Sequence, residues 1–204
     1  MNAREYLNWS RFLWWNYKLF AIQLMHFVDV KHVKRILDLG CGNGLLLDEL
    51  KIFFPDALII GLDLSKDMLT VRKHSNQVVI GKSEYSPFES NSFDIVTSTY
   101  SLHEFNVEKS LREIHRLLKD GGIFAFKEIN CDAPEWALFY LKSILTLFFD
   151  EKTVKNHIEL YNSFVSPKIL KQILKKNGFK ILEIKEGLFD FTIISIKKFK
   201  NKIT

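Results

Sequence analysis

Three glycines stand at alternate positions behind a short apolar run in the stretch ILDLGCGNGL, residues 36–45. Glycine permits positive φ and has no Cβ, so a turn built on Gly40, Gly42 and Gly44 can bring backbone N–H groups close to a ligand. A dinucleotide site needs Gly-x-Gly-x-x-Gly, and here the third glycine comes one place early. A P-loop needs a Lys-Ser/Thr pair after its last glycine, which the leucines at 45–47 do not supply. The turn therefore indicates a nucleotide-like ligand but fits neither pattern.

Two acids accompany the glycine turn. Asp38 lies between Leu37 and Leu39 inside the apolar run, where a carboxylate needs a buried partner. Asp63 ends the next apolar run, and its carboxylate can accept both hydroxyl hydrogens of a ribose. Each acid also has a purely structural interpretation, Asp38 as a solvated strand end and Asp63 as a helix cap. The position of Asp63 at a strand end favours a nucleoside ligand.

The elements that must position these residues alternate along the chain. We expect strands over 33–39, 57–62, 77–81, 93–98 and 123–129, and helices over 45–54, 65–74 with Ser65 as N-cap, and from Asn106 through Leu118 to the stop at 120–122. A further helix begins at Ser166-Pro167, and strands over 179–184 and 191–196 flank Gly187. This order predicts an α/β three-layer sandwich. Its seven-stranded, Rossmann-like sheet is mostly parallel and ends with an antiparallel C-terminal strand.

The stretch Leu37–Gly44 resembles the nucleotide-binding motif of the class I S-adenosylmethionine-dependent methyltransferases. Ile60-Gly-Leu-Asp63-Leu-Ser65 is similar to that family's second strand and its ribose-binding acid. Further similar stretches follow in order at 84–88 with 91–96, 101–103, 117–122 and 176–179. The resemblance is close over 33–129 and loose over 166–197. It implies methyl transfer, with S-adenosyl-L-methionine as cofactor.

The resemblance also implies a set of cofactor contacts. Gly40 and Gly42 would let the backbone meet the methionine end, Asp38 would meet its amino group, and Asp63 would hold the ribose. Leu64 and Met68 would cover an adenine face. The expected cofactor-binding residues are Asp38, Gly40, Cys41, Gly42, Asp63, Leu64, Met68, Ser83, Glu84 and Ser98.

One position departs from the family pattern. An acid often follows the glycine that ends the third strand and accepts from the adenine amino group, but here Gly81 is followed by Lys82. A lysine side chain has only donors and cannot accept that proton. We expect the backbone of Ser83 or the side chain of Glu84 to serve instead.

The candidate catalytic residue is His103, just after the fourth expected strand. Methyl transfer from a sulfonium relies on positioning and on exclusion of water, and it needs a side-chain base only when the acceptor loses a proton. An imidazole can take that proton near neutral pH. The alternative is that His103 only shapes its loop; Glu104 and Tyr100 are weaker candidate bases. The two cysteines, Cys41 and Cys131, form no metal-type pair, so we expect no metal.

Two aromatic-rich segments extend the single expected domain, which spans 1–204. Residues 1–30 form an N-terminal helical extension, and 130–165 form a helical insertion whose helix, 134–149, has Asp132 as its expected cap. Their aromatic side chains either pack on the sheet or form a substrate lid around a small, apolar or aromatic acceptor. With its basic polar face, the first helix is also compatible with peripheral membrane contact.

Composition bounds the remaining possibilities. The chain has 204 residues, 47% of them hydrophobic, a net charge of +5 and many lysines near its C-terminus. Lysine without clustered arginine fits a solvated face, so we expect no nucleic-acid partner. The absence of a signal-peptide pattern and the two isolated cysteines favour a cytoplasmic location. The oligomeric state is not indicated. Two other functions stay open: methylation of RNA or protein, and non-catalytic cofactor binding.

Overall fold

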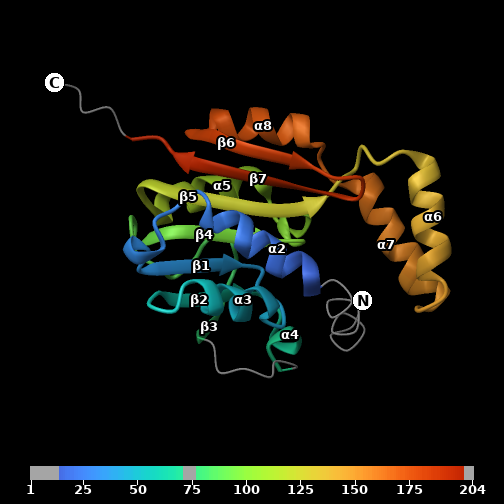
Figure 1. Ribbon diagram of the computed structural model, residues 1–204, viewed down its shortest axis with the longest axis horizontal. Coiled ribbons are helices and arrows are strands. Elements are labelled where there is room, and N and C mark those ends of the chain that lie inside the picture. The colour runs from blue at the N-terminus through green and yellow to red at the C-terminus, as the bar shows by residue number, and fades with distance from the viewer. Residues whose placement is uncertain (1–13, 71–76, 200–204) are drawn as a thin grey trace.

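The computed structural model of the chain describes residues 14–70 and 77–199. One seven-stranded sheet runs through the molecule, with helices on both faces (Figure 1). Its strands are β1 (Arg35–Leu39), β2 (Leu58–Asp63), β3 (Gln77–Ile80), β4 (Phe93–Thr99), β5 (Leu118–Ile129), β6 (Phe179–Glu186) and β7 (Asp190–Lys197). The order across the sheet is β3-β2-β1-β4-β5-β7-β6, and β7 alone runs in the direction opposite to the other six strands. The predicted fold class is confirmed.

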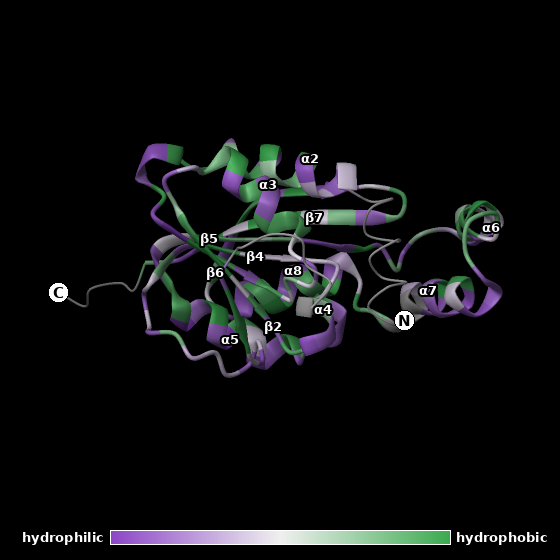
Figure 2. Cartoon of the chain, turned by 90° about the horizontal axis from the view of Figure 1, so that it is seen from below, coloured by the Kyte–Doolittle hydropathy of each residue, from purple (hydrophilic) through white to green (hydrophobic). Residues whose placement is uncertain are grey.

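The sheet separates two apolar clusters. Helices α2 (Trp14–Met25) and α3 (Leu45–Phe53) cover one face, while α5 (Val107–Leu117) and α8 (Pro167–Lys176) contribute to the cluster on the other. Figure 2 shows α2 and α3 on one side of the sheet and α5 on the opposite side. Successive residues of β1 alternate accordingly: Ile36 joins the α2/α3 cluster, and Leu37 joins the other. Burial on both faces explains why this strand reads as a continuous apolar run.

Side-chain caps set the starts of three predicted helices. Ser65 Oγ accepts from the Met68 N–H at 3.3 Å before α4 (Lys66–Thr70). The side chain of Asn106 accepts from the Lys109 N–H at 3.1 Å, and Ser166 caps α8, whose first residue is a proline. These interactions satisfy amide groups that have no partner within the helix, which is why the sequence locates these starts well.

Several element ends differ from the prediction by one or two residues, and two differences have a local physical cause. Leu118 is extended rather than helical, so α5 ends at Leu117 and β5 begins at once, with Leu118 paired to Phe93 and a register shift before Ile123. Asp132 is not the cap of the helix that follows it: α6 spans Glu135–Leu145, and Pro134 stands at its N-cap. Ala133 precedes this proline and so avoids the helical region, which excludes a helix that starts directly after Asp132.

The insertion contains two helices rather than one. After α6, the chain turns into α7 (Glu151–Ser163), capped by Asp150, whose side chain accepts from the Thr153 N–H at 2.9 Å. Both figures show this pair standing at one end of the molecule, beyond the edge of the sheet. Of the N-terminal extension, the described part is α2, followed by the 3-10 helix η1 (Val30–His32). None of the described helices is long and apolar enough to cross a membrane.

Candidate functional site

A cavity of about 1150 Å³ lies along the carboxyl ends of the parallel strands. Its wall includes Gly40 after β1, Asp63 at the end of β2, Lys82 after β3, Tyr100 after β4 and Ile129 at the end of β5. This edge is where open α/β sheets bind ligands. The cavity continues to helices α6 and α7, so the insertion forms part of its wall.

The glycine turn forms one side of the cavity in a conformation that needs glycine. Gly40, Gly42 and Gly44 all have positive φ, at 68°, 51° and 86°. A Cβ on Gly40 would lie 2.4 Å from the Ser101 Oγ atom, so no side chain fits there. The Gly40 N–H donates to the Leu62 carbonyl at 2.8 Å, which ties the turn to the end of β2. Both the positive φ and the lack of space for a side chain therefore require glycine at position 40.

Asp63 braces this turn and also lines the cavity. Its Oδ2 accepts from the Gly42 N–H at 2.7 Å, and its Oδ1 accepts from the Ser65 N–H at 2.8 Å. A carboxylate oxygen can accept more than one hydrogen bond, so both oxygens retain capacity for ligand hydroxyls. The structural role and the predicted ribose role are therefore compatible in one side chain.

Asp38 lies behind the cavity wall. Its side chain is 1% exposed, and the Thr97 hydroxyl donates to its Oδ1 at 2.8 Å. Burial raises the pKa of Asp38 to about 7; the Thr97 hydrogen bond opposes this and the charge of Asp63 adds to it. The expected buried partner is thus Thr97, and contact with the cofactor's amino group stays a prediction.

The other predicted cofactor residues divide into two groups. The first group lines the cavity and comprises Gly40, Gly42, Asp63, Leu64, Met68, Ser83 and Glu84. Cys41 and Ser98 instead support the turn from behind. The Cys41 side chain packs against Gly61, where a Cβ would lie 2.5 Å from its Sγ, and Ser98 Oγ is 2.9 Å from Ser101 Oγ. Any contact of Cys41 with a ligand would therefore come from its backbone.

The loop after β3 carries the position that departs from the family pattern. Lys82 lines the cavity and pairs with Tyr85 in an isolated bridge. The Ser83 hydroxyl lies 3.0 Å from that of Ser110, and Glu84 Oε1 accepts from the Asn106 N–H at 2.9 Å. The two expected substitutes for the missing acid thus both hold the loop against α5, and the backbone of Ser83 and the second oxygen of Glu84 are the remaining acceptors.

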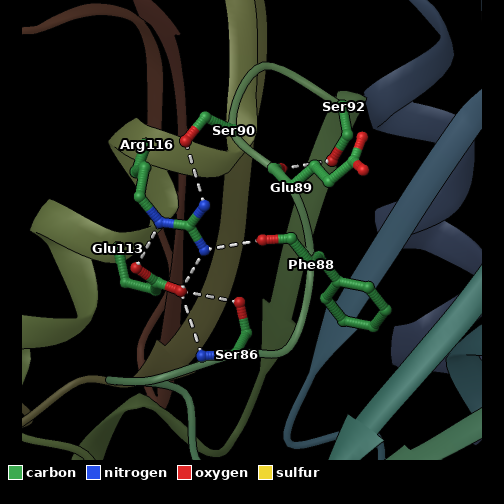
Figure 3. A network of polar contacts seen from close by, with 7 residues as sticks. All are labelled: Ser86, Phe88, Glu89, Ser90, Ser92, Glu113 and Arg116. Atoms are coloured by element: carbon green, nitrogen blue, oxygen red, sulfur yellow. Dashed lines mark hydrogen bonds and ion pairs between the residues drawn. The ribbon is translucent and has the colours of Figure 1, made fainter.

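An ion-pair network fastens the next part of this loop to α5 (Figure 3). Arg116 Nη2 donates to the Phe88 carbonyl at 2.8 Å, and its Nε donates to Glu113 Oε2 at 2.8 Å. Glu113 Oε1 accepts from the hydroxyl and the N–H of Ser86. Burial raises the pKa of Glu113, but the hydrogen bonds from Arg116 and Ser86 outweigh it and lower that pKa below its usual value. The network fixes the course of the loop that presents Lys82.

His103 is positioned by the 3-10 helix η2 (Leu102–Glu104), between β4 and α5. Its ring lines the cavity, and its Nδ1 lies 3.0 Å from Glu128 Oε1 in β5. Burial lowers the pKa of His103, but the hydrogen bond with Glu128 and the charges of Glu128 and Glu104 raise it overall. The structure thus brings the candidate base to the cavity and supplies a partner, Glu128, that the sequence analysis did not identify.

The far half of the cavity is built from residues that the sequence analysis left out. It is lined by apolar Ile129, Leu141, Leu145 and Phe189 together with His157 and Tyr161. Burial and the charge of His103 lower the pKa of His157 to about 4. His157 and Tyr161 are on α7, some 50 residues after His103, and no spacing in the sequence links them. A helical pattern at 151–163 was the only available signal.

A cluster of hydrogen-bonded polar side chains at the start of β7 borders this far half of the cavity. The Tyr100 hydroxyl donates to Asp190 Oδ2 at 2.8 Å, and Lys127 Nζ lies 2.7 Å from Asp190 Oδ1. Burial raises the pKa of Tyr100, and the nearby charge of Asp190 adds to this effect. Tyr100, expected only as a weak alternative base, therefore enters the site as a neutral hydrogen-bond donor that is already engaged by Asp190.

The two aromatic segments have different roles. In α2, Tyr17 and Phe20 are buried in the cluster on the α2/α3 face, so this part of the extension packs on the domain core, and Tyr17 also lines the cavity. In α6, Trp136, Phe139 and Tyr140 are exposed, while Leu141 and Leu145 face the cavity. These exposed aromatic side chains of α6 therefore do not line the cavity, whereas Tyr161 on α7 is buried and does line it.

Residues 37–126 match the family model described as a methyltransferase domain. An uncharacterized protein of Methanocaldococcus jannaschii is 32% identical, over 76% of this chain and 64% of that protein. The mitochondrial arginine-hydroxylase NDUFAF5 of Danio rerio is 30% identical, over 72% and 46%. A demethylmenaquinone methyltransferase of Chlorobaculum tepidum is 29% identical, over 79% and 72%. The chain thus spans less than two thirds of the first two relatives.

Solved structures share the fold. An S-adenosylmethionine-dependent methyltransferase of Aquifex aeolicus aligns over 88% of this chain and 91% of its own, with a TM-score of 0.67 and 16% identity. A phosphoethanolamine N-methyltransferase of Haemonchus contortus, in complex with S-adenosylmethionine, aligns over 90% and 53%, with a TM-score of 0.68 and 20% identity. At these identities the likeness concerns the fold.

Proposed function

We propose that this chain, which belongs to the class I S-adenosylmethionine-dependent methyltransferase family, transfers a methyl group to a small, apolar or aromatic acceptor. The cofactor of the family is S-adenosylmethionine. The cofactor would lie at the glycine-turn end of the cavity, and the acceptor would lie at the end lined by α6 and α7. Both placements rest on the geometry of the cavity wall.

The residues at the glycine-turn end fit the cofactor chemically. Asp63 offers carboxylate oxygens at the tip of β2 for ribose hydroxyls, and the cradle at Gly40 would be filled by any Cβ. Leu64 and Met68, which also line the cavity, would cover an apolar face of the adenine. When bound, the cofactor supplies a methyl group on a positively charged sulfur. The protein's part is to hold the acceptor in line and to exclude water.

The apolar end of the cavity carries the proposal for the acceptor. Ile129, Leu141, Leu145 and Phe189 supply apolar walls, and Tyr161 and the histidines supply a few polar groups. Ligand sites of small organic molecules have this composition, and drug-sized pockets measure about 300–1,000 Å³. A cavity of about 1150 Å³ is therefore large enough for a cofactor together with a small acceptor. By their names, relatives such as the demethylmenaquinone methyltransferase act on quinone-like compounds, which is in keeping with such walls.

The same observation supports the proposal that 130–165 acts as a substrate lid. Helices α6 and α7 contribute Leu141, Leu145, His157 and Tyr161 to the cavity, yet they stand beyond the edge of the sheet. A movement of this pair would open the acceptor end without disturbing the strands.

Methylation of RNA or protein is the less favoured function, because the sequence holds no Asn/Asp-Pro-Pro-Tyr type motif at 98–101.

Calorimetric titration with S-adenosylmethionine tests the cofactor part. We expect saturable heat from the wild-type protein, and its absence would refute the methyltransferase proposal. The acceptor part is tested with methyl-labelled cofactor and a fractionated extract. Label is expected in small, organic-soluble products, whereas label in RNA or protein would refute a small acceptor.

A further inference from the structure

Glu128 is a fully buried acid at the end of β5, with 0% of its side chain exposed. Its Oε1 accepts from the Ile129 N–H at 2.9 Å and lies 3.0 Å from His103 Nδ1, while its Oε2 accepts from the His103 N–H at 3.3 Å. Within the described part of the chain, its hydrogen bonds involve only His103 and its own neighbour. A buried charge is kept only when it is paired, so this carboxylate is committed to His103.

The contacts of Glu128 decide which ring nitrogen of His103 holds the proton. An ionised carboxylate can accept hydrogen bonds but cannot donate one, so Nδ1 carries the hydrogen in the neutral ring. The lone pair is then on Nε2, on the opposite side of the ring. Nε2 lies 3.7 Å from Oε1 of Glu104, whose side chain is 74% exposed. The Phe164 ring packs edge-on at 6.0 Å and limits rotation of the imidazole.

We propose that Glu128 is a positioning residue, which holds His103 with its Nε2 as a proton acceptor at the acceptor end of the cavity. This inference rests on the proposed function and narrows the acceptor class. An amine that binds in its neutral form is methylated through its lone pair and needs no base, whereas a hydroxyl must lose its proton. A histidine positioned in this way therefore indicates that the methyl acceptor is a hydroxyl group, such as that of a phenol or an enol.

The step balances without any further reactant. The acceptor O–H bond breaks, and its proton moves to His103 Nε2. The electron pair on the oxygen forms the new bond to the methyl carbon, while the pair of the broken carbon–sulfur bond stays on sulfur. The imidazolium, stabilised by the Glu128 carboxylate, then releases its proton to solvent, which restores the neutral ring.

The charged and titratable groups around His103 allow the role of Glu128 to be tested through the pKa of His103. Glu104 faces it from η2, Glu128 from β5, and His157 from α7. Burial alone would depress the pKa of His103, and the Glu128 contact reverses this. Removal of the Glu128 charge should therefore turn the raised pKa of His103 into a lowered one, because burial then dominates. Removal of the exposed Glu104 charge should change it much less, because solvent screens that group.

The test is nitrogen-15 NMR of the histidine rings, with His103 assigned through the variant His103→Gln. In the wild-type protein we expect the neutral ring to carry its hydrogen on Nδ1. In Glu128→Gln we expect the pKa of His103 to fall clearly below the wild-type value, and in the matched control Glu104→Gln we expect it to stay close to that value. A hydrogen on Nε2 in the wild type, which needs no variant to observe, or an unchanged pKa in Glu128→Gln would overturn the inference.

The chemical position of the label provides an independent readout. In the transfer assay above, the product should carry the methyl group on oxygen, and Glu128→Gln should slow its formation about 10²-fold. A product methylated on nitrogen would overturn the acceptor class. Lack of heat with S-adenosylmethionine would instead refute the proposed function, and the NMR result would still decide the role of Glu128.

Discussion

The Asp63 carboxylate accepts a 2.7 Å hydrogen bond from the backbone N–H of Gly42, which joins the tip of β2 to the turn after β1. The same carboxylate accepts from the Ser65 N–H and thereby also orders the start of α4. The acid and the glycine turn are therefore one unit. A change at Asp63 should affect the shape of the turn as well as any direct contact with a ligand.

We expect Asp63→Ala to weaken S-adenosylmethionine binding about 10–100-fold, since hydrogen bonds to a charged group contribute about 1.5–3 kcal/mol. Calorimetric titration measures the change. Asp56→Asn, an exposed acid in the turn before β2, is the matched control and should bind like the wild type. Equal affinities of Asp63→Ala and the wild type would remove Asp63 from the cofactor site.

Gly40→Ala should destabilise the fold. Its φ of 68° lies in the left-handed region, which costs a residue with a Cβ about 1–2 kcal/mol, and the new methyl group would also meet Ser101 Oγ at 2.4 Å. We expect a loss of at least about 1 kcal/mol in the free energy of unfolding, measured by urea denaturation. Gly81→Ala is the control, because that position has no positive φ and its nearest contact, at 3.2 Å, is a flexible Leu62 side chain. Equal losses at both glycines would contradict the argument.

The sequence was sufficient to predict the elements whose signals are local. The alternation of strands and helices, the caps at Ser65, Asn106 and Ser166, and the glycine turn all depend on residues close together in the chain. The resemblance also placed Asp63 and His103 at one edge of the sheet, and both line the cavity.

The residues that line the acceptor end of the cavity could not be predicted from such local signals. Its wall combines β5, α6, α7 and β7, and helical periodicity cannot show where an insertion folds back. Glu128 lies 25 positions after His103 in a strand that reads as apolar, so their contact depends on the register between β4 and β5. The use of Ser83 and Glu84 to hold the loop against α5 likewise follows from tertiary packing alone.

The network in Figure 3 should matter for cofactor affinity through the order of the loop after β3. Arg116→Met removes the link from α5 to the Phe88 carbonyl, so the loop must be ordered on binding. We expect cofactor affinity to fall about five-fold, which corresponds to about 1 kcal/mol, with faster amide hydrogen exchange over 82–92. Arg112→Met changes an exposed arginine on the same helix and should alter neither quantity. Rapid exchange in this loop of the wild type would show that the network does not order it.

Asp38 predicts an unusual dependence of stability on pH. Its pKa is about 7 in the folded chain and 3.8 in the unfolded chain, so between these values the folded state binds more protons than the unfolded state. The free energy of unfolding should therefore fall as pH rises from about 4 to about 7, because the buried acid must then ionise.

Asp38→Asn keeps an oxygen that can accept from Thr97 and removes the titration. Its free energy of unfolding should lack this decline, so the stability of the variant relative to the wild type should increase between pH 5 and pH 7.5. Urea denaturation at the two pH values measures the difference.

The partly exposed Asp94 provides a contrast. Hydrogen bonds from Lys119, Lys34 and Arg35 outweigh burial and lower its pKa, so Asp94→Asn should lose stability relative to the wild type as pH rises through the acid range. Parallel stability curves for Asp38→Asn and the wild type would mean that Asp38 is ionised throughout, held by a partner other than Thr97.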